Sequence, residues 1–248
     1  MSFKTVFKRY EFKYIISASQ KEKILSVIKK HMHPDEYGRT TIRNLYFDTD
    51  SYLLIRRSIE KPVYKEKLRI RSYKKTNENS IVFAEIKKKY KSVVYKRRLS
   101  MAYGTAMKWF CEKTYDFEHT QISDEINYFL NHYDNLHPRV YLSYEREAYC
   151  LNNQDDFRIT FDENILVRNT DLSLESEVYG TPILDSDTSL MEIKSSTSIP
   201  LWLVSVLSEE KIYKTPFSKY GTAYRNLIFP NLISKKSDNI KEEILNVR

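Results

Sequence analysis

Charged side chains alternate with apolar ones in several short segments, and the charged positions hold residue types that bind phosphate or divalent metal ions. Lys67, Arg69 and Arg71 alternate with apolar residues in one segment, and Glu192 and Lys194 do so in another. Ammonium and guanidinium groups form charge-assisted hydrogen bonds with phosphate oxygens. Carboxylate oxygens are the ligands that Mg²⁺ and similar hard cations prefer. Residues of these types could therefore bind anions such as phosphate, or they could form a charged strand face that lies in water.

The same alternation recurs elsewhere in the chain. It groups Glu11 with Lys13, Glu85 with Lys87, and Arg158 with Thr160 and Asp162. Successive side chains of a β-strand point to opposite faces, so a strand over each segment has one charged face and one apolar face. A sheet built from such strands would gather the charges on a single surface.

Period-two alternation predicts eight strands, and helical patterns predict five helices. The predicted strands span Val6–Ile16, Thr41–Asp48, Tyr64–Tyr73, Ile81–Lys88, Ser92–Leu99, Arg139–Ala148, Phe157–Asp162 and Leu190–Ser195. The predicted helices span Ser17–Lys30, Met101–Lys113, Ile122–His132, Pro200–Glu209 and Phe217–Ile228. The fold class is α+β with mostly antiparallel strands.

Two arrangements of these strands fit the pattern. An open antiparallel sheet would leave its charged face in water and pack its apolar face on helices. A sheet closed into a barrel would turn the charged faces into its lumen and the apolar faces toward outer helices. Removing so many ions from water costs several kcal/mol per ion, so this lumen must be wet and hold counter-ions or a polyanion.

Composition points to an anionic ligand. Lysine and arginine number 41 against 33 aspartate and glutamate residues, which gives a formal net charge of +8. This excess attracts anions. The 4 glycines are too scattered to form the loops whose backbone amides cradle phosphates, so a phosphate site must be built from side chains.

Several other classes of protein are disfavoured. Cys111 and Cys150 form no C-x-x-C motif, which favours a reducing compartment, and no H-E-x-x-H zinc motif occurs. The longest apolar stretch, Ile199–Leu207, is too short to span a bilayer, and the amino terminus lacks the apolar block of a signal peptide. We therefore expect a soluble, cytoplasmic chain that forms a single domain over residues 1–248.

A set of short motifs carries a resemblance to a known family. In order, they are Arg9-Tyr-Glu-Phe-Lys13, Leu45-Tyr-Phe-Asp48, Leu68-Arg-Ile-Arg71, Phe83-Ala-Glu-Ile-Lys87, Tyr95-Lys-Arg97, Tyr144-Glu-Arg146, Phe157-Arg-Ile-Thr-Phe-Asp162, Met191-Glu-Ile-Lys194 and Phe217-Ser-Lys-Tyr220. No single motif is specific, but their combination and order resemble the VTC domain. This is the polyphosphate polymerase domain of the vacuolar transporter chaperone complex and of its bacterial relatives.

The resemblance implies a triphosphate tunnel fold. This fold is an eight-stranded antiparallel barrel with helices packed outside, and its lumen holds a phosphate chain with Mn²⁺ or Mg²⁺. The domain core would cover residues 8–229, with a C-terminal tail over 230–248. The implied phosphate-binding cations are Lys13, Arg69, Arg71, Lys87, Lys96, Arg146, Arg158 and Lys219. Lys194, Ser218, Tyr144 and Glu11 are further substrate-binding candidates.

Carboxylates complete the implied site. Glu192 resembles the metal ligand of the family. Glu85, Asp162 and Glu11 are either second metal ligands or ion-pair partners of neighbouring cations. Ser218 follows Pro216 near the start of a helix, where it either contributes to phosphate binding or caps the helix.

The implied activity is a metal-dependent polyphosphate polymerase that moves the terminal phosphate of ATP onto a growing chain. A triphosphatase in the same tunnel and a non-catalytic polyphosphate-binding module are the alternatives. The triplet Arg9-x-Glu11-x-Lys13 replaces the Glu-x-Glu-x-Lys of the hydrolytic relatives, which favours the polymerase. A nucleic-acid ligand is not expected, because a narrow tunnel admits an unbranched phosphate chain more readily. This chain has no membrane segment of its own, but a separate membrane partner could exist.

Overall fold

The computed structural model describes residues 10–234 apart from Ser92 and Asn153. Its strands are β1 (Tyr10–Ser17), β2 (Met32–Pro34), β3 (Thr40–Asp48), β4 (Tyr64–Ser72), β5 (Ile81–Tyr90), β6 (Val93–Ala102), β7 (His137–Leu151), β8 (Gln154–Arg168), β9 (Thr181–Pro182) and β10 (Thr188–Ser195). Its helices are α1 (Ala18–Ile28), α2 (Leu53–Ile59), α3 (Tyr103–Glu112), α4 (Gln121–His132), α5 (Leu201–Glu209) and α6 (Lys219–Ala223), and α6 continues into a π-helical turn (Tyr224–Ile228).

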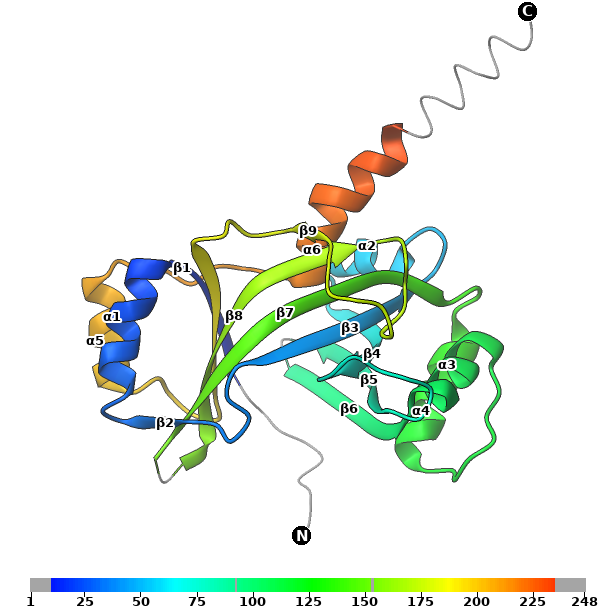
Figure 1. Cartoon of the computed structure of the whole chain (residues 1–248), viewed down its shortest axis with the longest axis horizontal. Helices are drawn as coiled ribbons and strands as arrows, with labels where there is room; N and C mark the ends of the chain where they lie inside the picture. The colour runs from blue at the N-terminus through cyan, green and yellow to red at the C-terminus, as the bar shows by residue number, and fades with distance from the viewer. Residues whose placement is uncertain (1–9, 92, 153, 235–248) are drawn as a thin grey trace, which may run out of the picture.

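One antiparallel sheet contains all eight predicted strands. They are hydrogen-bonded in the order β1-β10-β8-β7-β3-β4-β5-β6, with β2 paired to β7 and β9 paired to β8. The long strands β7 and β8 join the two halves of the molecule (Figure 1). The α+β class is confirmed. The predicted start of the first strand, at Val6, lies outside the described residues.

Closure of the sheet is incomplete. Strands β1 and β6 stand at the two ends of the strand order and form no backbone pairing with each other in the part of the chain that the structure describes. The segment that leads to α6 contacts β1 instead, where the Thr215 N–H donates to the Lys13 carbonyl at 2.7 Å. The opening is bridged by side chains, because Lys87 on β5 reaches Glu11 on β1 at 3.3 Å. The sheet is therefore curved, and its charged face is concave.

The apolar faces of the strands pack against outer helices, as predicted. Helices α1 and α5 cover the first half of the sheet, where Ile24 and Leu203 pack with Ile159 and Ile193. Helices α3 and α4 cover the second half, where Trp109 lies in the same core as Leu68 and Ala84. The two helix pairs lie at opposite ends of the molecule (Figure 1).

Helix α6 departs from the prediction that all helices lie outside. Tyr220 and Ile228 pack with Tyr46, Leu142 and Ile165 on the inner face of β3, β7 and β8. This inner face is apolar at that point, so it buries a helix rather than a polar ligand. Charged side chains remain on the concave face beside α6.

Some boundaries differ from the predicted ones. Strand β6 continues to Ala102, so α3 begins at Tyr103 rather than Met101. Short elements α2, β2 and β9 were not predicted. Ser17, which the prediction placed at the start of the first helix, is the N-cap of α1 and accepts a hydrogen bond from the Gln20 N–H. Within the described residues, no helix combines the length and hydropathy needed to cross a membrane.

Candidate active site

Two buried carboxylates lie at the centre of the concave face. Glu192 on β10 is opposite Lys13 on β1, and Asp162 on β8 is opposite Arg146 on β7. Directly opposite residues share a face of the sheet, so these four side chains point toward the same space. Asp162 is 0% exposed and Glu192 is 4% exposed.

A dense set of ion pairs holds these carboxylates. Arg146 forms a bidentate pair with Asp162: its Nε donates to Oδ1 at 2.5 Å, and its Nη2 donates to Oδ2 at 2.6 Å. Lys219, at the start of α6, contacts both Asp162 and Glu192. Glu192 also lies 3.3 Å from Lys13, 3.4 Å from Arg146 and 3.5 Å from Lys194.

The surrounding cations keep both carboxyl groups ionised. Burial by itself would raise the pKa of each group, because it penalises the charged form. The charges of Arg146 and Lys219 outweigh burial at Asp162, and those of Lys219 and Lys13 do so at Glu192. The pKa of each carboxyl therefore lies below its ordinary value, and both are anionic at neutral pH.

Glu85 belongs to a separate cluster on β4, β5 and β6. Its Oε2 lies 2.7 Å from Arg69 Nη2 and 3.2 Å from Arg71 Nη2, and its Oε1 lies 2.7 Å from Lys96 Nζ. Burial raises the pKa of this carboxyl, but the charges of Arg69 and Lys96 lower it by more. The pKa of Glu85 therefore lies below its ordinary value. The structure thus places Glu85 as a counter-ion for three predicted phosphate-binding cations and apart from Glu192.

Glu11 connects the two clusters. Its carboxylate lies 3.6 Å from Lys13 and 3.3 Å from Lys87. The charge of Lys87 is the largest cause that lowers the pKa of Glu11, to about 2. The predicted cations of β1 and β5 therefore meet through this carboxylate, across the opening of the sheet.

The other predicted residues have more varied environments. Arg158 shares the concave face but turns to Asp35, which lies 2.5 Å away. The Tyr144 ring lies 5.1 Å below the Arg146 guanidinium and 4.6 Å from the Lys219 amine, so it contributes cation–π contacts. Ser218 is the N-cap of α6 and accepts a hydrogen bond from the Gly221 N–H, as the helix-cap interpretation expects.

Lys67 also lies at this site, although it is not among the phosphate-binding cations that the family resemblance implied. Its Nζ donates to Ser218 Oγ at 3.0 Å. Burial, followed by the charges of Lys87 and Lys13, lowers the pKa of Lys67 to about 7. The signal for it was present in the sequence, because Lys67 shares its strand face with Arg69 and Arg71.

We expect Lys67→Met to stabilise the ligand-free protein. With its pKa lowered to about 7, Lys67 binds its proton less tightly in the folded than in the unfolded chain, so its charge destabilises the fold at low pH. This destabilisation declines as pH rises above about 7. Urea denaturation should therefore show a larger gain at pH 6 than at pH 9, with exposed Lys108→Met as the control. A gain in stability at pH 6 that is no larger than the gain at pH 9, or a loss of stability at pH 6, would contradict the electrostatic account.

Glu192 and Asp162 are the carboxylates that could hold a divalent cation, and only together with other ligands such as phosphate oxygens. Among the described residues, no group of three or more histidine, cysteine, aspartate or glutamate side chains is placed to hold a metal ion. Mg²⁺ is commonly held by one or two carboxylates together with substrate phosphates. Glu192 and Asp162 supply such a pair of hard oxygen donors, both within reach of Lys219.

The curved antiparallel sheet thus carries a cationic concave face around buried carboxylates. The chain belongs to the VTC domain family, whose sequence model matches residues 8–228. No curated protein matches the chain in a sequence comparison.

The chain is similar to several solved structures, of which the first supports this fold. A Bacillus halodurans protein provisionally assigned as an adenylate cyclase is 16% identical over 87% of this chain and 96% of its own, with a TM-score of 0.56. A Hippeastrum protein, provisionally assigned as an adenylyl cyclase and described as having a dominant triphosphatase activity, is also 16% identical. It aligns over 87% of this chain and 94% of its own, with a TM-score of 0.49. At 16% identity, the similarity to the Bacillus halodurans protein shows a shared fold and nothing about activity.

Proposed function

We propose that this chain is a metal-dependent polyphosphate polymerase that transfers the terminal phosphate of ATP to a phosphate chain. The observation that carries the proposal is the concave face, where Lys13, Arg146, Lys194 and Lys219 surround Glu192 and Asp162. Membership of the VTC domain family supports a phosphate-chain substrate.

Phosphoryl transfer depends mainly on positioning and on neutralising charge, so it needs no covalent nucleophile from the protein. Arg146 is fixed by two short contacts with Asp162 and presents a rigid donor group. Lys13 and Lys194 contact Glu192 only at 3.3 and 3.5 Å, so each can turn to a phosphate oxygen without breaking a short ion pair. A bound Mn²⁺ or Mg²⁺ would neutralise further charge on the transferred phosphate. Glu192, with Asp162, is the group that would hold it.

Incubating the purified chain with ATP and Mn²⁺ or Mg²⁺ tests this proposal. We expect long phosphate chains on a gel, and we expect high salt to suppress them by screening the contacts between phosphate and cations. Release of orthophosphate without polymer would identify a triphosphatase in the same site. Tight binding of triphosphate with neither product, under either metal, would identify a binding module instead.

A further inference from the structure

A ladder of lysines extends the concave face beyond the carboxylate clusters. On the paired strands β4 and β5, Lys65 is directly opposite Lys89, and Lys67 is directly opposite Lys87. All four share the face of Arg69 and Glu85, because they alternate with the buried apolar residues of these strands. Like charges placed directly opposite each other destabilise a sheet. These two lysine pairs are therefore unfavourable in the protein without a ligand.

Carboxylates compensate little of this charge. Lys65 donates to the Ser58 carbonyl at 3.1 Å, and Lys67 donates to Ser218 Oγ, so both use neutral acceptors. Lys89 forms no ion pair with any described residue, and Lys87 reaches Glu11. On the outer face of the same strand the situation differs, because Lys88 pairs with Glu125 on α4 at 2.7 Å.

The ladder is also partly shielded from water. Lys65, Lys67, Lys87 and Lys89 are all of intermediate exposure. Burial, followed by the charges of Lys89 and Lys61, lowers the pKa of Lys65. A multivalent anion lying along the ladder would remove this repulsion, since its negative charges would face both lysine pairs, Lys65 with Lys89 and Lys67 with Lys87.

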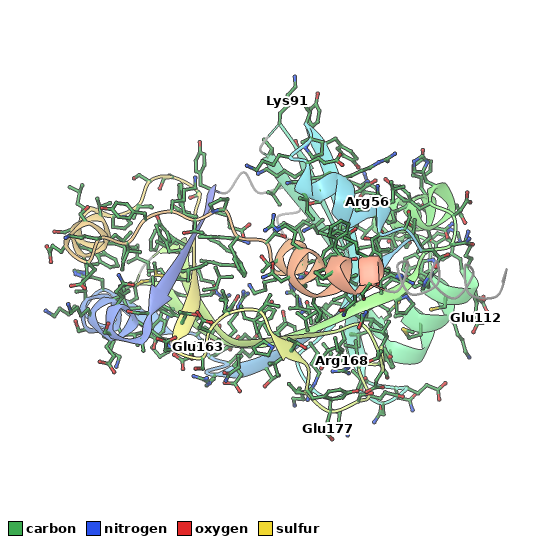
Figure 2. The ribbon with its side chains drawn as sticks, turned by 90° about the horizontal axis from the view of Figure 1, so that it is seen from above. Arg56, Lys91, Glu112, Glu163, Arg168 and Glu177 are labelled. Carbon is green, nitrogen blue, oxygen red and sulfur yellow. The ribbon has the colours of Figure 1, made fainter. Side chains whose placement is uncertain are left out.

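The ladder is continuous with the proposed reaction site. Lys67 contacts Ser218, the neighbour of Lys219, and Lys87 contacts Glu11. In the other direction, β5 leads from Lys89 to the turn at Lys91, which protrudes from the body of the molecule (Figure 2). The lysines thus lead from the carboxylate clusters toward the outside.

We propose that Lys65, Lys67, Lys87 and Lys89 form a track for the part of a linear phosphate chain that extends beyond the reaction site, toward the β5–β6 turn. This inference rests on the proposed function and adds a preference for chains longer than a triphosphate. A nucleic acid fits the track less well. The exposed tyrosines at this end, Tyr64 and Tyr90, alternate with the lysines and so lie on the opposite face of the sheet, where they cannot stack bases against a strand held by the ladder.

The test compares two ligands with one double variant, Lys65→Gln with Lys89→Gln. These two lysines form the outer pair of the ladder, away from the carboxylate clusters. Calorimetric titration should show triphosphate affinity within about twofold of wild type and long-chain polyphosphate affinity about tenfold weaker, since two charge contacts are lost. The control removes the same charge elsewhere, with Lys75→Gln and Lys108→Gln, and should change neither affinity.

The outcomes separate the track from the proposed function. Unchanged long-chain affinity in the Lys65 and Lys89 variant would overturn the track, even if triphosphate still binds. Failure of the wild-type protein to bind triphosphate would instead contradict the proposed function. A single-stranded oligonucleotide should bind weakly and respond little to the variant. A tenfold loss for that ligand as well would show that the ladder binds polyanions in general and would overturn its selectivity for phosphate chains.

Discussion

Glu192→Gln is expected to lower metal-dependent turnover by at least about a hundredfold, which corresponds to about 2.7 kcal/mol of lost transition-state stabilisation. The amide keeps the size of the side chain but loses the charge that would hold a divalent cation. It also leaves Lys13, Lys194 and Lys219 with less compensation, so these amines remain available to phosphate. Triphosphate binding without metal should therefore persist. Steady-state rates over a series of Mn²⁺ concentrations measure the effect.

The matched control is Glu145→Gln. Glu145 precedes Arg146 on β7 but points to the outer face, where it pairs with Arg39. Its loss should leave turnover within about twofold of wild type, as for an exposed ion pair. High Mn²⁺ should restore part of the activity of the Glu192 variant, because an amide oxygen is a weaker ligand. Wild-type rates in that variant at low Mn²⁺ would refute the metal assignment.

Four carboxylates on the concave face serve as internal counter-ions. Glu11, Glu85, Asp162 and Glu192 are each in contact with at least two lysine or arginine side chains. These pairings make the ligand-free fold possible, since unpaired buried cations would be costly. They also explain why a phosphate chain can bind here, because its oxygens can replace carboxylate contacts one at a time.

The alternation of charged and apolar residues was sufficient to predict the eight longer strands and the two faces of the sheet. Leu68, Ile86 and Ile193 are completely buried on the outer side, while Arg69, Lys87 and Lys194 lie on the concave side. Such a pattern is local, because it depends only on the period of a strand. The prediction therefore needed no knowledge of how the strands pair.

Features that depend on distant contacts were not predictable. Helix α2 begins without a side-chain cap of its own; Asp48, at the end of β3, accepts hydrogen bonds from the Leu54 and Ile55 N–H groups instead. The inward position of α6 depends on the apolar inner face formed by residues such as Tyr46 and Leu142 from separate strands. The separation of Glu85 from Glu192 likewise follows from strand order, which the sequence pattern does not specify.

Asp162→Asn is expected to lower the free energy of unfolding by about 3–5 kcal/mol, the usual loss when one partner of a buried ion pair is removed. Asp162 is 0% exposed, and it binds Arg146 through two short hydrogen bonds and also contacts Lys219. An asparagine keeps the shape but leaves both cations with only Glu192 as a carboxylate partner, at 3.4 and 3.2 Å. Urea denaturation of ligand-free protein at pH 7 measures the loss.

The dependence of this loss on pH identifies its cause. Because the folded-state pKa of Asp162 is lowered, its ion pairs stabilise the fold fully above the ordinary aspartate pKa of 3.8, and that stability disappears as pH falls through the folded-state value. The difference between wild type and variant should therefore be constant from pH 7 to pH 5 and shrink in more acidic solution. Glu177→Gln, which removes an exposed partner of Lys75, should leave stability nearly unchanged throughout. A loss for Asp162→Asn as small as that of Glu177→Gln would mean that Arg146 and Lys219 are hydrated in solution, and that the concave face is more open than its burial indicates.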